Sequence, residues 1–203
     1  MPPKFRSTRE EMIAAALELV RQGGKDALTA RALGAKLGCS AKPIFGLFRN
    51  MEELTDAVRA AAMRKYDTYV GTAWDYTPAF KRFGMQMVLF AAEEPNLFRL
   101  LFMRNNREQA NLSTLKTLLG PTRLLCLDAI AKDYQMSEKE AAAFFEHMWI
   151  FTYGLAVLCA TGMCQFSEEE LCTILGRQFM GAIGLMKSGR WDSRTPHPEI
   201  QNR

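Results

Sequence analysis

The segment from Thr29 to Phe48 carries the residue types and spacing of a helix-turn-helix, whose chemistry is the recognition of DNA base edges. Gly34 supplies a small residue where two short helices can pack closely, and Gly38 supplies a turn four residues later. The positions that such a corner must bury are apolar: Leu33, Leu37, Cys39, Ile44 and Leu47. The second helix would enter a major groove by its N-terminal end, presenting outward Ser40, Ala41, Lys42 and Gly46. An unspecialised helical corner is the alternative, because glycine between amphipathic helices is common.

The positive charge of the chain is concentrated in the same quarter of the sequence. Residues 1–50 hold nine Lys and Arg against four acidic residues, a net charge of +5, whereas residues 51–203 have a net charge of −1. This asymmetry indicates a basic module for a polyanion, joined to a larger neutral body. Arg31 and Lys36 are expected to face phosphates. A chance imbalance of surface charge is the alternative interpretation.

Helical periodicity extends over almost the whole chain, and we find no alternating strand pattern bounded by turns. The first four helices have capping residues at their starts: Ser7 or Thr8, Thr29, Ser40 and Asn50. These helices are expected to end near Gly23, Gly38, Phe48 and residue 71. Further helices are predicted over 78–93, 95–104, 111–132, 137–163 and 167–188, the last two capped by Ser137 and Ser167. The predicted fold class is all-α, with about nine helices.

Composition and motifs exclude several classes of protein. The sequence contains no run of 18 uninterrupted apolar residues and no apolar signal peptide, so we expect a cytoplasmic protein without a membrane span. Five cysteines and two histidines without metal-ligand spacing predict no disulfide framework, no metal and no cofactor. We find no nucleophile elbow or phosphate loop, and His147 is expected to be buried or at a pocket edge. The chain is therefore predicted not to be an enzyme.

The stretch LTARALGAKLGCSAKPIFGLFRNMEELTDAV resembles the N-terminal DNA-binding domain of TetR/AcrR-type transcriptional regulators. The resemblance covers residues 7–62 and rests on Thr29, Leu33, Gly38, Ser40, Phe48, Glu52, Glu53 and Leu54. Two later stretches, FAAEEPNLFRLLFM and MWIFTYGLAVL, are similar to a C-terminal subtype whose signature is a Trp followed by His-Gly. This chain has Trp149 followed by Tyr153 and Gly154, so the histidine of that signature is replaced.

The chain departs from the family at two positions that contact phosphates. The family usually has a Tyr in the third helix and a Lys at the start of the fourth, where this chain has Phe45 and Met51. Phosphate contacts are therefore expected to depend on Lys42, Arg31, Arg49, Lys4, Arg6 and Arg9. Lys42 is also a candidate for reading guanine, with a solvated surface lysine as the alternative. The predicted DNA-binding residues are Thr29, Arg31, Ser40, Ala41, Lys42, Phe45 and Arg49.

Aromatic and methionine side chains are dense in the second part of the chain. Most such stripes at helical spacing form a core, but they also suit a pocket for varied apolar ligands. The resemblance implies such a pocket among helices four to eight, for a small apolar or aromatic effector. The candidate ligand-binding residues are Trp74, Phe83, Met87, Phe90, Phe102, Met103, Met148, Trp149 and Tyr153.

Small residues recur along the last two long helices. They are Gly154, Ala156, Ala160 and Gly162, then Gly176, Gly181, Ala182 and Gly184. Glycine inside a helix costs about 1 kcal/mol relative to alanine, so their number suggests close helix approach. The resemblance implies a homodimer through these two helices as a four-helix bundle. Burial of the small faces within one chain is the alternative.

These observations predict a ligand-responsive, homodimeric regulator that binds double-stranded operator DNA, with repression relieved by the effector. Its parts would be a helix-turn-helix domain over 1–50, a ligand-binding and dimerisation domain over 51–190, and a polar tail over 191–203. Two other functions stay open. One is a thiol-based redox sensor using Cys159, Cys164 and Cys172. The other is a helical small-molecule carrier or enzyme that has lost DNA binding, suggested by Phe45 and Met51.

Overall fold

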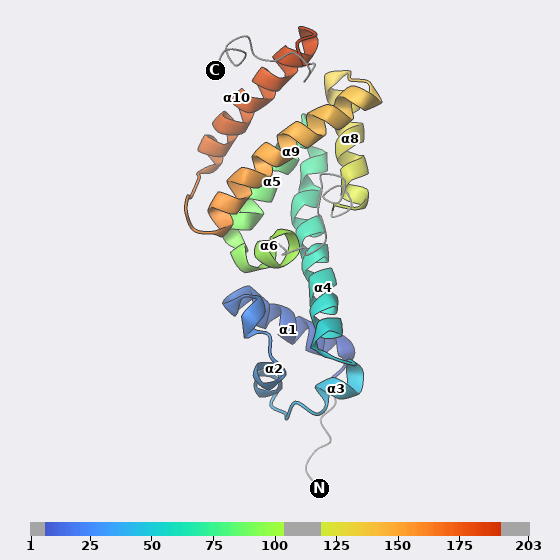
Figure 1. Ribbon diagram of the computed structural model, residues 1–203, viewed down its shortest axis with the longest axis vertical. Coiled ribbons are helices and arrows are strands. Elements are labelled where there is room, and N and C mark those ends of the chain that lie inside the picture. Colours follow the sequence, from blue (N-terminus) through green and yellow to red (C-terminus); the bar gives the residue numbers. More distant parts are fainter. Residues whose placement is uncertain (1–6, 104–118, 192–203) are drawn as a thin grey trace, which may run out of the picture.

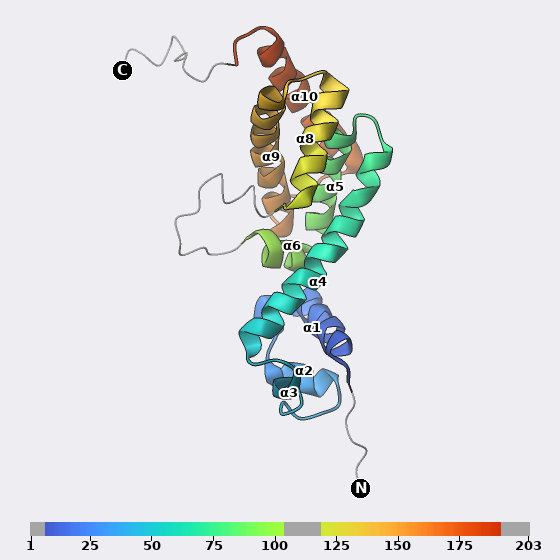
Figure 2. The same cartoon turned by 90° about the vertical axis from the view of Figure 1, so that its right-hand side faces the viewer.

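The computed structural model describes residues 7–103 and 119–191. Within these ranges the chain forms nine α-helices and two short 3-10 helices, so the predicted all-α class is confirmed. The molecule is elongated, with a small head formed by α1–α3 at one end and a larger helical body at the other (Figures 1 and 2). A single long helix, α4, runs from the head into the body.

The head is a three-helix corner. Helix α1 (Arg9–Gly23) starts at a capping box in which the Thr8 hydroxyl accepts from the Glu11 backbone and the Glu11 carboxylate accepts from the Thr8 backbone. A 3-10 turn, η1 (Lys25–Ala27), leads to α2 (Ala30–Lys36), and α3 (Ile44–Leu47) follows. The head core is formed by buried side chains from all three helices and from the start of α4: Met12, Ala16, Val20, Leu33, Ile44, Phe48 and Leu54.

Helix α4 (Met51–Gly71) begins at Asn50, whose side-chain oxygen accepts from the Glu53 N–H, as predicted. Its first half packs against α1, and its second half packs against α5 and α6 in the body. Leu54 and Val58 are therefore in the head core, whereas Tyr66 and Val70 are in the body. This one helix thus contributes buried side chains to both the head and the body.

The body is built around α5 (Ala79–Glu93), which follows the 3-10 helix η2 (Thr72–Asp75). The helices around it are α6 (Pro95–Phe102), α8 (Pro121–Tyr134), α9 (Glu138–Ala160) and α10 (Glu168–Lys187). Helix α9 is long and apolar enough, by length and composition, to cross a membrane. It packs against α5, α6, α8 and α10, which is the environment of a core helix in a bundle.

The capping residues in the sequence predict most helix starts correctly, but several helix ends differ from the prediction. Ser137 and Ser167 cap α9 and α10 as expected. Helix α6 ends at Phe102, and α9 ends at Ala160 before Gly162, whose φ of +74° turns the chain. The predicted helix 111–132 begins at Pro121 in the described part, and residues 111–118 lie outside it. Residues 192–203 of the predicted tail also lie outside the described ranges.

The predicted start of the third helix was wrong. Ser40 does not cap α3, which begins only at Ile44 after a pair of turns. The Ile44 N–H donates to the Ala41 carbonyl and the Gly46 N–H to the Pro43 carbonyl, both three residues back. Pro43 disfavours helical backbone angles at the preceding Lys42, and this favours turns over a regular first helical turn after Ser40. Ser40, Ala41 and Lys42 therefore lie in the turn that precedes α3.

Candidate functional site

Gly34 allows the close packing of the helix-turn-helix corner. A Cβ atom on Gly34 would lie 2.8 Å from the carbonyl oxygen of Cys39 and 3.2 Å from the carbonyl carbon of Ser40. The Cys39 N–H donates to the Gly34 carbonyl at 2.8 Å, and Gly38 adopts a φ of +68° that favours glycine. The role predicted for Gly34 is confirmed, since no side chain fits between α2 and the turn that follows it.

The outer surface of the corner carries most of the predicted DNA-binding residues. Thr29 is exposed, but its hydroxyl oxygen accepts from the Ala32 N–H at 3.1 Å and caps α2. Arg31, Ser40 and Lys42 are exposed, and Ala41 is partly exposed. Lys4 and Arg6 lie outside the described residues. The α2–α3 corner forms the lower tip of the head, away from the body (Figure 1).

Helix α3 turns two apolar side chains outward. Phe45 is 50% exposed and Leu47 is 40% exposed. The prediction that Leu47 is buried was therefore wrong. Ile44 and Phe48, four residues apart, occupy the inner face of α3, and the residues between them must point toward solvent.

Arg49 and Arg9 converge on the carboxylate of Glu53, a residue that carries the family resemblance but for which no contact with either arginine was predicted. Both the backbone N–H and the Nε of Arg49 donate to Glu53 Oε2, at 2.9 and 3.0 Å, and Arg9 lies 3.7 Å from Glu53 Oε1. The Arg49 backbone N–H, and then its side chain, hold the pKa of Glu53 below its usual range. The Arg9 guanidinium also lies 4.7 Å from the centroid of the Phe48 ring. A phosphate contact by Arg49 would therefore compete with Glu53.

Residues 12–58, from α1 to the first half of α4, match the family model "Bacterial regulatory proteins, tetR family". Residues 12–58 therefore form a DNA-binding domain of the TetR type. Because a domain of this type binds operator DNA, the chain is a DNA-binding transcriptional regulator, a class of protein that is not enzymatic. A bacterial transcriptional regulator is a soluble protein, which implies the cytoplasm.

The whole chain also shares its fold with a solved structure. A chain from Mesorhizobium loti, assigned to the TetR family and solved at 1.54 Å, is 18% identical to this regulator, with a TM-score of 0.55. The alignment covers 90% of this chain and 98% of that one. At 18% identity, the similarity between the two structures supports only the fold, that is, the arrangement of head and body. No curated protein sequence matches the chain.

Three of the predicted ligand-binding residues meet around a small cavity in the body. Phe83, Met87 and Trp149 line it together with residues from α5, α9 and α10: Phe80, Gly84, Thr152 and Phe179. The free space is about 10 Å³, room for roughly one water. The buried indole Nε1 of Trp149 has no hydrogen-bond partner among the described residues. The cavity is therefore small, lined largely by aromatic side chains, and bordered by a residue with one unused donor.

The remaining predicted ligand-binding residues lie in neighbouring clusters. Phe90 and Phe102 pack edge-on against Tyr66, with ring centroids 5.2 and 5.0 Å away. Tyr153 stacks on Trp149 at 5.1 Å and donates its hydroxyl to the Phe102 carbonyl at 2.9 Å. Met148 is buried in the core, whereas Met103 is exposed directly after α6. The nine residues thus do not surround one common cavity.

A second, more open hollow lies where η2 and the start of α5 face α8. It has a volume of about 220 Å³. Its lining combines aromatic, aliphatic and charged side chains: Trp74, Tyr76, Thr77, Ala79, Leu125, Asp128, Ala129, Lys132 and Asp133. Asp133 accepts from the Ala79 N–H at 3.0 Å and so caps α5 from a helix 54 residues away. Of these residues only Trp74 was predicted, because the pairing of η2 with α8 has no local sequence signal.

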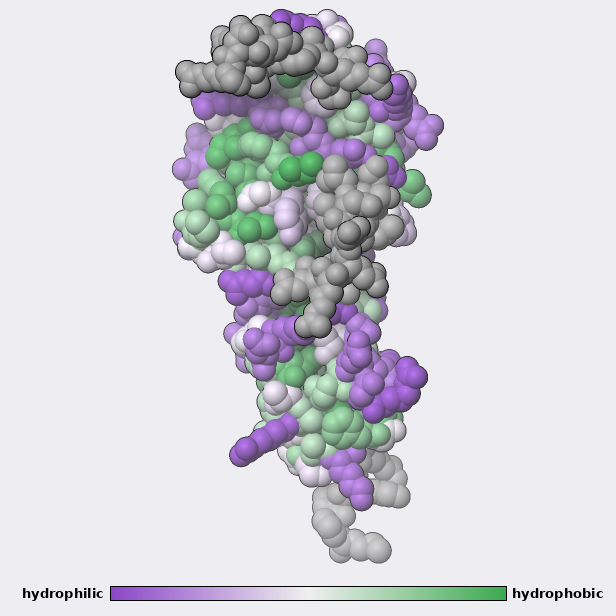
Figure 3. All heavy atoms as spheres, viewed as in Figure 1, coloured by the Kyte–Doolittle hydropathy of each residue, from purple (hydrophilic) through white to green (hydrophobic). Residues whose placement is uncertain are grey.

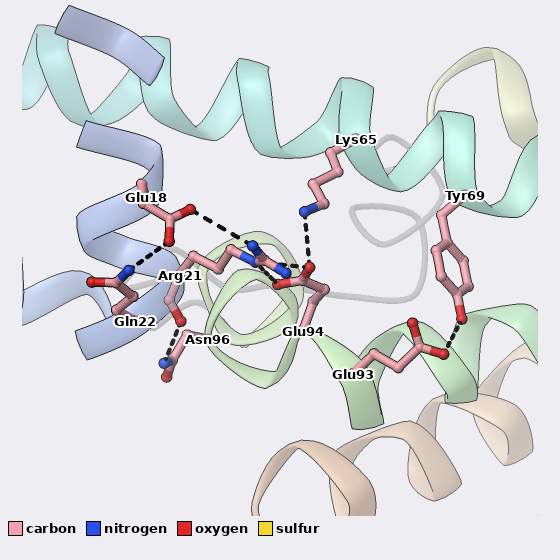
Figure 4. Close-up of polar contacts among 8 residues, drawn as sticks. All are labelled: Glu18, Arg21, Gln22, Lys65, Tyr69, Glu93, Glu94 and Asn96. Atoms are coloured by element: carbon pink, nitrogen blue, oxygen red, sulfur yellow. Dashed lines mark hydrogen bonds and ion pairs between the residues drawn. The ribbon is translucent and has the colours of Figure 1, made fainter. Parts of the chain in front are cut away.

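The head and the body are also joined by a polar cluster of Arg21, Lys65, Glu94 and Asn96, called here the Glu94 cluster (Figure 4). The Glu94 carboxylate, at the corner between α5 and α6, accepts from Arg21 Nε on α1 at 2.8 and 2.9 Å. Lys65 on α4 lies 2.8 Å from its Oε1, and the Asn96 amide donates to the Arg21 carbonyl at 2.9 Å. No local sequence pattern indicates this cluster, because Arg21 and Glu94 are 73 residues apart.

Helices α9 and α10 leave part of their small and apolar surface uncovered (Figure 3). Cβ atoms placed on Gly154, Gly181 and Gly184 would meet no other atom within 4 Å among the described residues. Exposed apolar side chains lie on the same helices: Ile150, Met180 and Leu185. In contrast Ala156, Ala160 and Ala182 are buried within the chain. His147, expected to be buried or at a pocket edge, is exposed, with its Nε2 2.8 Å from Gln178 Nε2 on α10.

Proposed function

We propose that this regulator is a homodimeric repressor that leaves its operator when a small apolar or aromatic effector enters the body. The observation that carries the proposal is the double connection between head and body, through α4 and through the Glu94 cluster. A change of helix packing in the body is thereby transmitted to a head that exposes a helix-turn-helix. The functional parts are the head over 1–50, the body over 51–190 and the tail over 191–203.

The DNA-binding surface is proposed to consist of the exposed corner of the head. Arg31 and Arg49 contact phosphates, and Lys42 donates to a base edge from the turn before α3. Thr29, Ser40, Ala41 and Phe45 complete the surface. Half-sites about one helical turn apart would suit two heads related by a two-fold axis.

The effector site is proposed to form around the cavity beside Trp149. Because the present space admits only about one water, a ligand must push the surrounding helices apart, and this links binding to a change in packing. The unused Trp149 Nε1 donor favours an aromatic ligand with one hydrogen-bond acceptor. Operator release follows only if this ligand binds the opened arrangement more tightly than the closed one.

Dimerisation is proposed to occur through the exposed faces of α9 and α10. Both helices carry uncovered glycines beside exposed apolar side chains, a combination that allows two helix pairs to pack closely. The two heads would then point in the same direction and bind adjacent half-sites.

The decisive experiment measures operator affinity with and without effector. The purified full chain is titrated with a duplex from its own upstream region and with random DNA over a range of salt concentrations. We expect a dissociation constant of about 10⁻⁸ M or lower for the operator. Addition of an effector found by thermal-shift screening should weaken operator binding about tenfold. Unchanged affinity with bound effector would refute the coupling. Equally weak binding to both duplexes would favour the carrier that has lost DNA binding.

The thiol-sensing alternative has less support. Burial, and to a smaller extent the nearby Cys164, raise the pKa of Cys159. A smaller fraction of its thiol is therefore in the thiolate form that oxidants attack. Burial also raises the pKa of Cys126 far above its usual range. Cys172 is exposed, with Lys81 Nζ 3.4 Å from its sulfur, and is the thiol whose alkylation with and without peroxide tests the alternative.

A further inference from the structure

The outward face of α3 has no side-chain hydrogen-bonding group. Ile44 and Phe48 are buried on the inner face, so Phe45, Gly46 and Leu47 face away from the head core. Phe45 and Leu47 are about half exposed, and a Cβ on Gly46 would meet nothing within 4 Å among the described residues. The helix that a helix-turn-helix places in the major groove therefore presents an aromatic ring, a bare backbone and an isobutyl group.

Positively charged side chains are exposed on the segments that precede this apolar surface in the head. Arg31 and Lys36 on α2 and Lys42 in the turn before α3 are exposed, and the first 50 residues have a net charge of +5. Figure 3 shows hydrophobic surface among hydrophilic side chains at the head end of the molecule. The partner that suits this combination is a polyanion with apolar groups on the face that α3 meets. Duplex DNA fits, because the thymine C5-methyl is the apolar group on the base edges of the major groove.

We propose that Phe45 and Leu47 recognise thymine methyl groups in each operator half-site, while Ser40 and Lys42 supply the hydrogen bonds to neighbouring base edges. Gly46, between the two apolar side chains, lets the α3 backbone approach the groove closely. The inference rests on the DNA binding that the family implies, and it specifies what part of the base edge this chain reads. Sequence specificity at these positions then depends on contacts with thymine methyl groups. A recognition helix with polar side chains would use hydrogen bonds to base edges there.

The test begins with selection of operators from a random duplex pool by the full-length protein. Each thymine of the selected half-site is then replaced by uracil, which removes the methyl and leaves base pairing and the other groove atoms unchanged. We expect one or two positions per half-site at which each lost methyl lowers affinity about fourfold. Replacement of the symmetric pair in both half-sites should lower it about sixteenfold.

Two variants assign the methyl contacts to side chains. Phe45→Ala should bind the thymine duplex more weakly and should no longer distinguish thymine from uracil at one position of the half-site. Leu47→Ala should have the same two effects at a different position. Both residues are exposed, so the thermal unfolding of the variants should match that of the wild type. Leu124→Ala, at an exposed leucine on α8, is the matched control and should keep the full distinction.

Three outcomes would overturn the inference. If no sequence is enriched, DNA recognition by this head is itself refuted, and the apolar face of α3 is a protein-binding surface. If operators are enriched but uracil and thymine bind equally at every position, sequence recognition stands and methyl recognition is wrong. If Phe45→Ala weakens binding to thymine and uracil duplexes by the same factor, Phe45 positions the backbone and does not read a methyl.

Discussion

Arg21 on α1 and Glu94 at the corner of α5 and α6 form an ion pair across the junction of head and body. The Arg21 Nε lies 2.9 Å from Oε1 and 2.8 Å from Oε2 of Glu94. Glu94 is only 7% exposed, and Lys65 on α4 approaches the same carboxylate. The carboxylate therefore connects three helices at the point where the head meets the body (Figures 1 and 4).

Glu94→Gln is expected to lower the free energy of unfolding by about 1–3 kcal/mol, because a nearly buried, doubly paired carboxylate loses its charge. Urea unfolding of the full chain at pH 7 measures the change. Glu18→Gln is the matched control, since Glu18 also pairs with Arg21, at 3.7 Å, but its side chain is 38% exposed. Its expected effect is below about 1 kcal/mol. Equal effects of both variants would contradict the role given to the Glu94 cluster.

The contribution of Glu94 should depend on pH. Burial raises the pKa of Glu94, but hydrogen bonds from Arg21 and Lys65 outweigh it and leave the pKa below its usual range. A lowered folded-state pKa stabilises the protein at neutral pH, and this stabilisation is lost as the pH falls through the folded-state value. The stability difference between wild type and Glu94→Gln should therefore shrink in urea unfolding series from pH 7 to pH 3.5. A difference independent of pH would show that the charge of Glu94 is unimportant.

Gly34→Ala is expected to distort the helix-turn-helix. The added methyl would lie 2.8 Å from a backbone oxygen, so the turn must shift at a cost of about 1–3 kcal/mol. Operator affinity should fall as Ser40 and Lys42 move with the turn. Gly71→Ala is the control, because its Cβ would meet nothing within 4 Å among the described residues. Thermal unfolding and operator titration check both variants, and normal operator binding by Gly34→Ala would count against the tight corner.

Met180→Glu is expected to weaken the proposed dimer. Met180 is 71% exposed on α10, and two-fold packing there would bring the new carboxylates into an apolar interface. Light scattering over a concentration series should show a shift toward monomer, accompanied by weaker operator binding. Met163→Glu, at a 74% exposed methionine in the turn after α9, is the control and should leave the oligomeric state unchanged. Dimers of unchanged affinity in Met180→Glu would place the interface elsewhere.

Trp149→Phe is expected to change ligand preference more than stability. The substitution keeps an aromatic ring and removes the indole N–H, which has no partner among the described residues. If this donor serves the effector, the wild type should bind quinoline about five- to tenfold more tightly than naphthalene, and the variant should bind them equally. Calorimetric titration with the two compounds measures this. An unchanged ratio would exclude the Trp149 donor from the ligand site.

Some features of this regulator were readable from the sequence because their causes are local. Thr8, Thr29, Asn50, Ser137 and Ser167 cap the helices that follow them, since each side chain reaches a backbone N–H three residues ahead. The all-α class, the helix-turn-helix and the basic head depend on periodicity and composition over short distances. The start of α3 was wrong because the turns around Pro43 replace a helical first turn.

Tertiary structure alone decided which distant residues meet. Arg21 and Glu94 are 73 residues apart, and Asp133 caps α5 from 54 residues away, so no local pattern joins them. Phe83, Met87 and Trp149 were recognisable as apolar, but only the packing of α5, α9 and α10 placed them around one cavity and Phe90 outside it. Periodicity predicts that a side chain faces a core. The helix crossing decides which partners it finds there, because crossing angle and position depend on all the packed side chains together.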